Sequence, residues 1–397
     1  MQNPLRIALI GRESADNVRV WSGTPFFEKR AVAKHLGQVI DLSPAKVNPV
    51  PFKVANRISR KLTGRISTAD HIKGYGRRIG RYFTDLLRQS EYDLVFVPGG
   101  KETIAWLETD IPIIYYSDAT WELVRNYYHV YTDAPEWADR NGEEMEQTAI
   151  SKSSTLCYSS HWASQSAINH YGADPANVHT LFLGANLMNP PRREEVLPRR
   201  RGDSLRLLLV GVNWEIKGGS IALSVLEELL ACGYDAWLTV VGCTAPDGVS
   251  HPRMEVIPFL NKQIPHERER FEKAWHDADF FILPSRHEAA GLVFCEASAH
   301  GLPIVAARTG GIPSLVVDGK NGYTVPHQDE PGGYVRILRE LADNPERYAQ
   351  LCESARDEYE TRLNWDAWGT SLAEVISNQF PHLRERIEAF RAETLGG

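Results

Sequence analysis

The segment 279–303 constrains the fold more than any other stretch of the chain. An apolar run at 279–283 predicts a buried strand of a parallel sheet, which Pro284 ends. A helix should begin near Gly291 and close at Gly301, because glycine and proline mark helix ends. The helix N-terminus then faces the carboxyl edge of a sheet, where backbone N–H groups suit phosphate. We therefore expect a ligand site in this loop.

Glu296 stands out in the predicted helix because its neighbours are apolar or small. Burying an unpaired carboxylate costs several kcal/mol, so Glu296 needs partners. The vicinal hydroxyls of a ribose would satisfy both oxygens, and Glu288, eight residues earlier in the loop, could address a second polyol. The alternative is that Glu296 pairs with a structural arginine and that Glu288 is a solvated loop acid. The spacing by itself leaves both interpretations open.

The segment resembles the signature of retaining glycosyltransferase family 4, whose members have the GT-B fold. In that signature two glutamates separated by seven residues flank a glycine turn, and a small-residue helix and Gly-Leu-Pro follow, as they do here. The resemblance implies that Glu288, a catalytic candidate, holds hydroxyls of a donor sugar and that Glu296 holds the ribose. It also implies that the donor diphosphate meets the backbone of Ala290, Gly291, Leu292 and Val293.

A second phosphate candidate follows the apolar strand predicted at 205–210. The loop 211–219 carries Lys217 directly before two glycines, an order that excludes a Walker A loop. A lysine at a helix start can add charge to a phosphate site that the helix dipole favours, or it can be structural. In family 4 this lysine binds the donor diphosphate. The resemblance therefore implies a catalytic and donor-binding role for Lys217, with Asn213 and Trp214 beside it.

Three further positions compare with the family in different ways. The turn 256–262 resembles the turn that recognises the nucleotide base, which makes Lys262 a donor-binding candidate. Val212 stands where the family commonly has an arginine, so one expected cation is missing. Ser314 stands where many relatives have glutamate after Gly-Gly-Ile-Pro.

The first half of the chain also alternates strands and helices. A strand at 5–10 leads to Gly23, which permits close backbone approach before a helix at 26–36. Family members line the cleft near donor phosphates and acceptor with a glycine loop here, so Gly23 is a donor-binding candidate. A strand at 111–116 leads to Asp118, which the resemblance makes a catalytic candidate, although relatives often have histidine there.

Residues 53–81 are strongly basic, with Asp70 as the single acid and apolar residues interleaved among the cations. One interpretation is a surface for anionic lipid headgroups or an anionic acceptor. The other is a solvated helical excursion.

Composition excludes several classes of protein. The 397 residues are long enough for two domains, and a net charge of −7 gives no reason to expect nucleic acid as a partner. No window approaches the roughly 20 apolar residues of a membrane span, and we expect no signal peptide. Five scattered cysteines without a Cys-x-x-Cys pair give no hint of zinc and fit a cytoplasmic protein, with peripheral contact at the inner face of the membrane as a further possibility.

These observations and the resemblance together predict an α/β protein of GT-B architecture, with two Rossmann-like doubly wound domains facing each other across a cleft. We expect an acceptor-side domain at 1–188 with a C-terminal crossover helix at about 380–397, a linker at 189–203 and a donor domain at 204–379. The expected activity is retaining, metal-independent transfer, without a resident cofactor, from a UDP- or GDP-sugar to a glycan, lipid-linked or small-molecule acceptor. Val212 and Ser314 keep open a binding protein with reduced activity. Another GT-B enzyme, a phosphorylase or nucleotide-sugar epimerase, is a further alternative.

Overall fold

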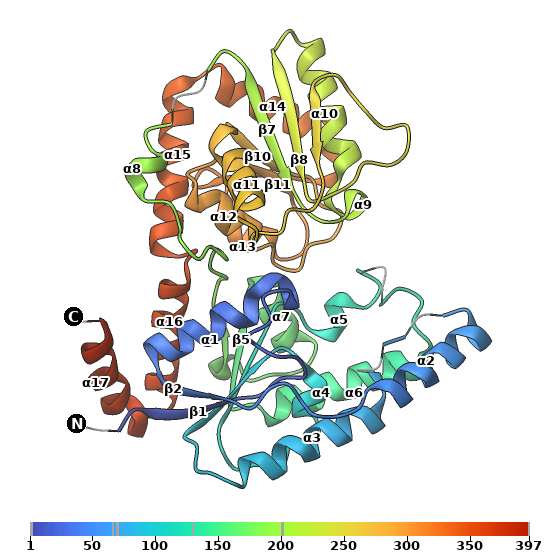
Figure 1. The fold of residues 1–397 in the computed structure, drawn as a ribbon, viewed down its shortest axis with the longest axis vertical. Coiled ribbons are helices and arrows are strands. Elements are labelled where there is room, and N and C mark those ends of the chain that lie inside the picture. Colours follow the sequence, from blue (N-terminus) through green and yellow to red (C-terminus); the bar gives the residue numbers. More distant parts are fainter. Residues whose placement is uncertain (1–2, 66, 69–70, 129–130, 200–201, 396–397) are drawn as a thin grey trace. The chain divides into compact units, whose positions relative to one another are not determined.

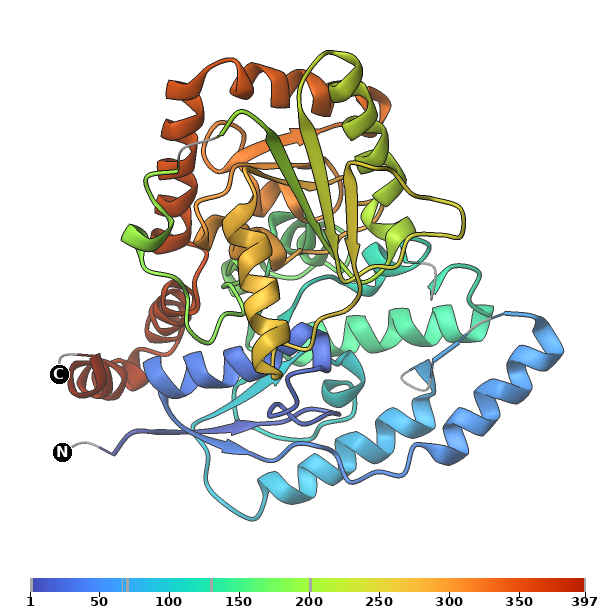
Figure 2. The same cartoon turned by 45° about the horizontal axis from the view of Figure 1, so that its top comes forward.

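The computed structural model describes residues 3–65, 67–68, 71–128, 131–199 and 202–395. Its contacts divide the chain into two compact units (Figures 1 and 2). Unit 1 comprises Met1–Phe182 and Trp365–Gly397, and unit 2 comprises Leu183–Asn364. Each unit holds a six-stranded sheet in which every pairing between described strands is parallel, so the predicted α/β class is confirmed.

The sheet of unit 1 has the order β2-β1-β3-β4-β5-β6. Its strands are Leu5–Leu9 (β1), Gly37–Asp41 (β2), Leu94–Pro98 (β3), Ile113–Ser117 (β4), Thr155–Tyr158 (β5) and Val178–Thr180 (β6). The chain leaves β1 toward one side of the sheet and returns on the other side at β3. This reversal is a topological switch point, at whose carboxyl edge doubly wound sheets bind ligands.

Helices cover both faces of this sheet. They are Thr24–His35 (α1), Val50–Thr63 (α2), Lys73–Leu87 (α3), Lys101–Ile104 (α4), Trp121–Val124 (α5), Glu136–Lys152 (α6), His161–Asn169 (α7), Trp365–Gln379 (α16) and Arg384–Leu395 (α17). Successive strand residues point to opposite faces. Tyr115 therefore joins the core with Phe83 of α3, whereas the ring of Tyr116 contacts Trp368 of α16.

The division of the chain differs from the expected boundaries. Unit 2 begins at Leu183, and the return to unit 1 begins at Trp365, because α16 buries Trp368 and α1 meets it through Lys34, whose ammonium lies 2.7 Å from Asp366. Part of the expected linker forms a short helix, Arg193–Val196 (α8). Its Arg193 lies 2.6–2.8 Å from three acids of the long helix Pro345–Thr361 (α15), which ties the segment to unit 2.

The basic segment 53–81 falls on two helices with different environments. The apolar residues of α3, including Tyr75 and Ile79, belong to the core of unit 1, so their interleaving with cations reflects an ordinary amphipathic helix. On α2, by contrast, Val50, Val54 and Ile58 are exposed. Residues 66, 69 and 70 of this segment lie outside the described residues.

The sheet of unit 2 has the order β12-β11-β10-β7-β8-β9. Its strands are Leu205–Val210 (β7), Ala236–Val241 (β8), Met254–Ile257 (β9), Phe280–Leu283 (β10), Ile304–Ala307 (β11) and Gly322–Val325 (β12). The order reverses between β7 and β10, which pair directly. The two loops that the sequence singled out therefore follow the two strands of a switch point.

Helices of unit 2 complete the alternation. They are Trp214–Lys217 (α9), Gly219–Ala231 (α10), Pro265–Asp277 (α11), Val293–Ala299 (α12), Ile312–Leu315 (α13), Gly332–Ala342 (α14) and α15. Among the described residues of both units, no helix combines the length and hydrophobicity that a bilayer span requires.

Glu146 of α6 is a buried carboxyl group in the core of unit 1. It accepts hydrogen bonds from the backbone N–H of Trp121 at 3.1 Å and from the hydroxyl of Tyr115 at 3.3 Å. Burial raises the pKa of Glu146 to about 7, and the nearby charge of Lys101 offsets only part of that increase. The folded protein therefore holds a proton there at pH values where the unfolded chain has lost it.

We predict that Glu146→Gln stabilises the protein at pH 8 but not at pH 4. The wild-type free energy of unfolding should fall as pH rises from about 4.5 to about 7, since only the unfolded state releases the proton freely there. The neutral amide mimics the protonated acid and removes this loss, which is roughly 3 kcal/mol at most. Urea unfolding at a series of pH values measures it. Equal destabilisation of the variant at both pH values would contradict the assignment.

Candidate functional site

The loops after β7 and β10 meet at the carboxyl edge of the second sheet. The side chain of Asn213 accepts a hydrogen bond from the backbone N–H of Ile216 at 2.8 Å and so caps the short helix α9. The backbone N–H of Arg286 donates to the carbonyl of Ile216 at 2.8 Å, which joins the two loops directly. The segments that sequence analysis treated separately therefore form one structure.

Glycines allow this close approach. Gly218 has φ of 71°, and a Cβ atom there would clash with the carbonyl oxygen of Pro284. A Cβ atom on Gly211 would lie 2.5 Å from Cγ of Lys217. Trp214 is buried, and its indole N–H donates to Ser220 at 3.1 Å, so the ring fixes the loop against α10. The donor contact predicted for Trp214 therefore would have to come from its backbone.

Lys217 and Glu288 form an ion pair between these loops. Both side chains are largely shielded, with 18% and 11% of their surface exposed. The backbone N–H of Gly311 donates to the carbonyl oxygen of Glu288 at 3.1 Å and holds the loop from the other side. The structure thus brings together two predicted site residues whose pairing the sequence did not indicate.

Glu296 lies in α12, and its side chain is 3% exposed. Nζ of Lys262 lies 3.0 Å from Oε1 of Glu296, and it also lies 4.5 Å from the ring centre of Phe271. The buried carboxylate thus pairs with a lysine from the loop after β9. The structural interpretation of Glu296 had predicted an arginine as its partner. That lysine is itself a predicted donor-binding residue.

The remaining predicted positions of this loop surround the pair of glutamates. Ala290 is buried, whereas Leu292 and Val293 are half-buried at the start of α12. Gly291 has φ of 87°, and a Cβ atom there would lie 2.5 Å from the ring of Phe294. Glycine is therefore required for the turn that leads into the helix.

Arg286 and His287 belong to the same loop, and sequence analysis did not assign them. Arg286 forms an ion pair with the buried Glu330. Burial, followed by the charges of Arg286 and His327, lowers the pKa of His287, which favours its neutral form. The sequence signal that could have identified Arg286 and His287 is their position between the strand and Glu288.

The two positions that depart from the family pattern have different environments. Val212 is 72% exposed, whereas Ser314 is buried and its carbonyl accepts a hydrogen bond from Arg362 at 2.7 Å.

Gly23 and Asp118 belong to unit 1, where both follow strands at the carboxyl edge. Gly23 has φ of 90° and caps α1, and Asp118 follows β4 directly.

Glu28 of α1 was missed by sequence analysis. It is fully buried, and neither carboxyl oxygen has a hydrogen-bond partner among the residues that the structure describes. Burial, followed by the charge of Asp118, raises the pKa of Glu28 well above its usual value. Its spacing from the buried Ala31, Val32 and His35 was the overlooked signal.

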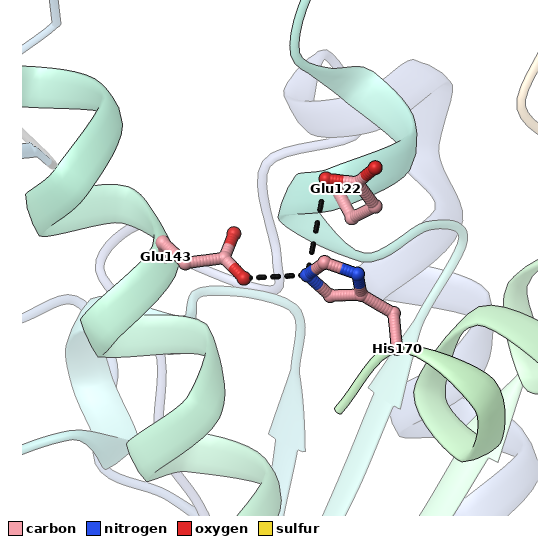
Figure 3. A group of neighbouring side chains, drawn as sticks. All are labelled: Glu122, Glu143 and His170. Carbon is pink, nitrogen blue, oxygen red and sulfur yellow. Dashed lines mark hydrogen bonds and ion pairs between the residues drawn. The ribbon is translucent and has the colours of Figure 1, made fainter. Parts of the chain in front are cut away.

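One group of metal-ligating side chains occurs in the described part of the chain, and it lies in unit 1. Glu122, Glu143 and His170 point toward one another (Figure 3), with Nε2 of His170 2.7 Å from Glu143 and 3.9 Å from Glu122. Arg125 pairs with Glu122, and the hydroxyl of Tyr171 donates to Glu143 at 3.1 Å. These partners already compensate the carboxylates, so the cluster by itself does not indicate a metal.

Comparisons with known proteins agree with this architecture. Residues 204–344 match the family model described as glycosyl transferases group 1. D-inositol 3-phosphate glycosyltransferase 2 of Catenulispora acidiphila is 31% identical over 304 residues, which are 71% of this chain and 69% of that protein. D-inositol 3-phosphate glycosyltransferase of Corynebacterium efficiens is 28% identical over 329 residues, or 77% and 74% of the two chains.

Solved structures confirm the predicted GT-B fold. Sucrose-phosphate synthase of Thermosynechococcus elongatus superposes with a TM-score of 0.66 at 16% identity, covering 95% of this chain and all of that one. HepE of Anabaena in complex with UDP-glucose has a TM-score of 0.60 at 15% identity, covering 94% of this chain and all of that one. The chain therefore belongs to the group 1 glycosyl transferases, glycosyltransferase family 4, and is a glycosyltransferase.

Proposed function

We propose that this enzyme transfers a sugar, with retention at the anomeric carbon, from a nucleotide-diphosphate sugar held on unit 2 to an acceptor held on unit 1. The observation that carries the proposal is the pair of lysine–glutamate contacts at the switch point, Lys217 with Glu288 and Lys262 with Glu296. HepE, whose structure contains UDP-glucose, shares the fold and supports a UDP-sugar donor, with a GDP-sugar as the alternative.

The two contacts suggest how the donor would be received. A diphosphate would take Lys217 as a charged hydrogen-bond donor, and Glu288 would then accept from hydroxyls of the sugar. In the same way, ribose hydroxyls would replace Lys262 at the oxygens of Glu296. Each carboxylate keeps a partner in both states, so neither is left buried and unpaired.

The leaving diphosphate would be stabilised during transfer by Lys217 and by the backbone near Gly291. We assign no nucleophilic residue, because attack from the same face with help from the leaving phosphate accounts for retention. Asp118, whose charge acts on the buried Glu28, is proposed to serve the acceptor from unit 1. The acceptor classes remain glycans, lipid-linked substrates and small molecules, and the two inositol-phosphate relatives favour the last of these.

Transfer is further proposed to need no divalent metal. Asp277 and Asp279, the Asp-x-Asp pair beside β10, precede that strand at the edge opposite the site. A chelator should therefore leave activity intact, and rescue of chelator-inhibited activity by manganese would contradict this part. In that case Glu143→Gln would test the cluster in Figure 3.

A binding protein without transfer activity is the second candidate, because Val212 exposes an apolar side chain where the family commonly has arginine. Incubation with UDP-glucose and with GDP-mannose, with and without acceptors, separates the candidates. A donor that binds but is neither transferred nor hydrolysed would favour the binding protein.

Lys217→Ala should weaken binding of the nucleoside diphosphate by roughly 10- to 100-fold, because a charged hydrogen bond contributes about 1.5–3 kcal/mol. The variant also leaves Glu288 facing the diphosphate without its cation, so the double variant Lys217→Ala, Glu288→Gln should recover part of the affinity. Calorimetry with UDP and GDP measures this, with the exposed Lys320→Ala as control. Wild-type affinity in the single variant would show that Lys217 is only structural.

The two glutamates should differ in which ligand they affect. Glu296→Gln should weaken both the free nucleoside diphosphate and the sugar nucleotide, since both carry the ribose. Glu288→Gln should leave the free nucleotide bound at least as well and should lower sugar binding or turnover. The same titrations with UDP and UDP-glucose compare them, and unchanged nucleotide affinity in Glu296→Gln would refute its assignment.

A peripheral membrane contact through α2 is also proposed. Val50, Val54 and Ile58 expose an apolar stripe at four-residue spacing, with exposed fractions of 58%, 48% and 54%. Exposed cations flank the stripe, and the helix lies at the margin of unit 1 away from the strands in both views (Figures 1 and 2). This is the pattern of an interfacial helix.

Replacing Arg57, Arg60 and Lys61 by serine should lower binding to anionic vesicles at least tenfold, since each cation near such a surface contributes about 1 kcal/mol. Sedimentation with phosphatidylglycerol vesicles measures it. Replacing three exposed cations of α11, namely Arg268, Arg270 and Lys273, is the matched control. Equal effects of both triple variants, or no binding by the wild type, would contradict the membrane contact and show that α2 is only a solvated helix.

A further inference from the structure

A cavity of about 550 Å³, lined by polar and apolar side chains, lies in unit 1, beside the loop that follows β1. Its polar lining includes Arg12, Lys53, Asn56, Ser67, Thr68 and Tyr75. Its lining residues follow β1 and β2 or lie within 53–75, and Arg12 reaches Glu102 after β3, the other strand of the switch point. Its volume suits a ligand the size of a sugar phosphate.

Asn56 of α2 offers this cavity a hydrogen-bond donor. Only 9% of its surface is exposed, and its Oδ1 accepts from the hydroxyl of Ser67 at 3.0 Å. With the oxygen so engaged, the amide nitrogen has no hydrogen-bond partner among the described residues. The amide N–H groups can therefore donate to an acceptor oxygen brought by a ligand.

The charges around the cavity favour an anion. Arg12 lies 3.4 Å from Glu102 of α4 and 3.5 Å from Glu13, so two carboxylates hold the guanidinium in place. A guanidinium has five N–H donors and can keep these contacts while binding a further oxyanion. Lys53 is exposed and has no ion pair in the described part of the chain.

The rest of the polar lining consists of hydroxyl groups and one acid. Ser67, Thr68 and Tyr75 carry hydroxyl groups, and Glu13 is the one acid that lines the cavity. Two cations, an amide and the hydroxyls of Thr68 and Tyr75 match the several oxygens of a phosphate and the hydroxyls of an attached polyol. A neutral sugar would leave the charge of Lys53 unused.

We propose that this cavity binds the phosphate ester of a phosphorylated polyol, with Lys53 and Asn56 as its main donors and Arg12 behind them. That this phosphate ester belongs to the acceptor rests on the proposed transferase function, whereas binding itself does not. The ester can come from a soluble sugar phosphate or from the headgroup of a phospholipid, since both present the same group.

Calorimetry on the full-length protein without nucleotide tests the site, with inorganic phosphate and glucose 6-phosphate as probes and glucose as the uncharged comparison. We expect glucose 6-phosphate to bind, glucose not to bind detectably, and both Lys53→Ser and Asn56→Asp to weaken binding at least tenfold. Lys46→Ser is the matched control, because Lys46 is exposed next to two lining residues but does not line the cavity. Its affinity should change less than twofold.

Lys53→Ser alters an exposed residue, so it keeps the test valid if Asn56→Asp unfolds. The proposal is overturned if neither phosphate compound binds, if glucose binds as well as its phosphate, or if Lys46→Ser loses as much affinity as Lys53→Ser. UDP affinity, measured in the same variants, should stay unchanged. A protein that binds glucose 6-phosphate through Lys53 but transfers no sugar would retain the phosphate site and contradict only the proposed function.

Phosphatidylcholine vesicles with and without phosphatidylinositol distinguish the two sources. Displacement of glucose 6-phosphate only by vesicles that contain phosphatidylinositol would support the site and identify a lipid headgroup. Bound glucose 6-phosphate that neither vesicle displaces would support the site with a soluble ester as its ligand.

Discussion

Two carboxylates held at the carboxyl edge of the second sheet impose the main electrostatic constraint on this enzyme. Glu288 and Glu296 have little contact with solvent, and each lies against a lysine from another loop. An ionised carboxylate cannot stay in such a place without a cation or several hydrogen-bond donors. The two lysines therefore also stabilise the two carboxylates when no ligand is bound. These two contacts link segments that follow β7, β9 and β10.

The same topological rule locates the chemistry in both units. In unit 2 the reversal lies between β7 and β10, and the loops after both strands carry the paired residues. In unit 1 the reversal lies between β1 and β3, and Arg12 after β1 pairs with Glu102 after β3. The two sites differ, however, in whether their charged and polar groups already have partners. In the site of unit 2 the lysines and glutamates pair with one another. In the cavity of unit 1, Lys53 has no ion pair and the amide nitrogen of Asn56 has no hydrogen-bond partner among the described residues.

Local patterns in the sequence predicted what is local in the structure. The strands, the turn at Gly291 and the exceptional position of Glu296 follow from apolar runs, glycines and neighbours within a few residues. The partners of the glutamates could not be predicted in this way, because Lys217 and Lys262 lie 71 and 34 positions away in the chain. Burial could not be assigned within 53–81 for the same reason. The cations of α2 and α3 look alike in sequence, but only tertiary packing shows that Ile79 enters the core and Ile58 does not. Glu28 was overlooked although its helical spacing matched a buried face.

Val212 makes the Lys217–Glu288 contact more consequential than it would be in relatives with an arginine at that position. Its exposed apolar side chain contributes no charge. The other cation of the signature loop, Arg286, is already compensated by the buried Glu330. Under the proposed function Lys217 is thus the main fixed charge for a diphosphate at this switch point, and in this structure it is paired with Glu288. Under the proposed function, donor binding separates that pair, and the separation is most favourable when the ligand supplies both an anion for Lys217 and hydroxyl groups for Glu288. A free nucleoside diphosphate offers the first without the second. The contact therefore provides a physical basis for preferring the complete sugar nucleotide over its product, which is what release of the spent nucleotide requires.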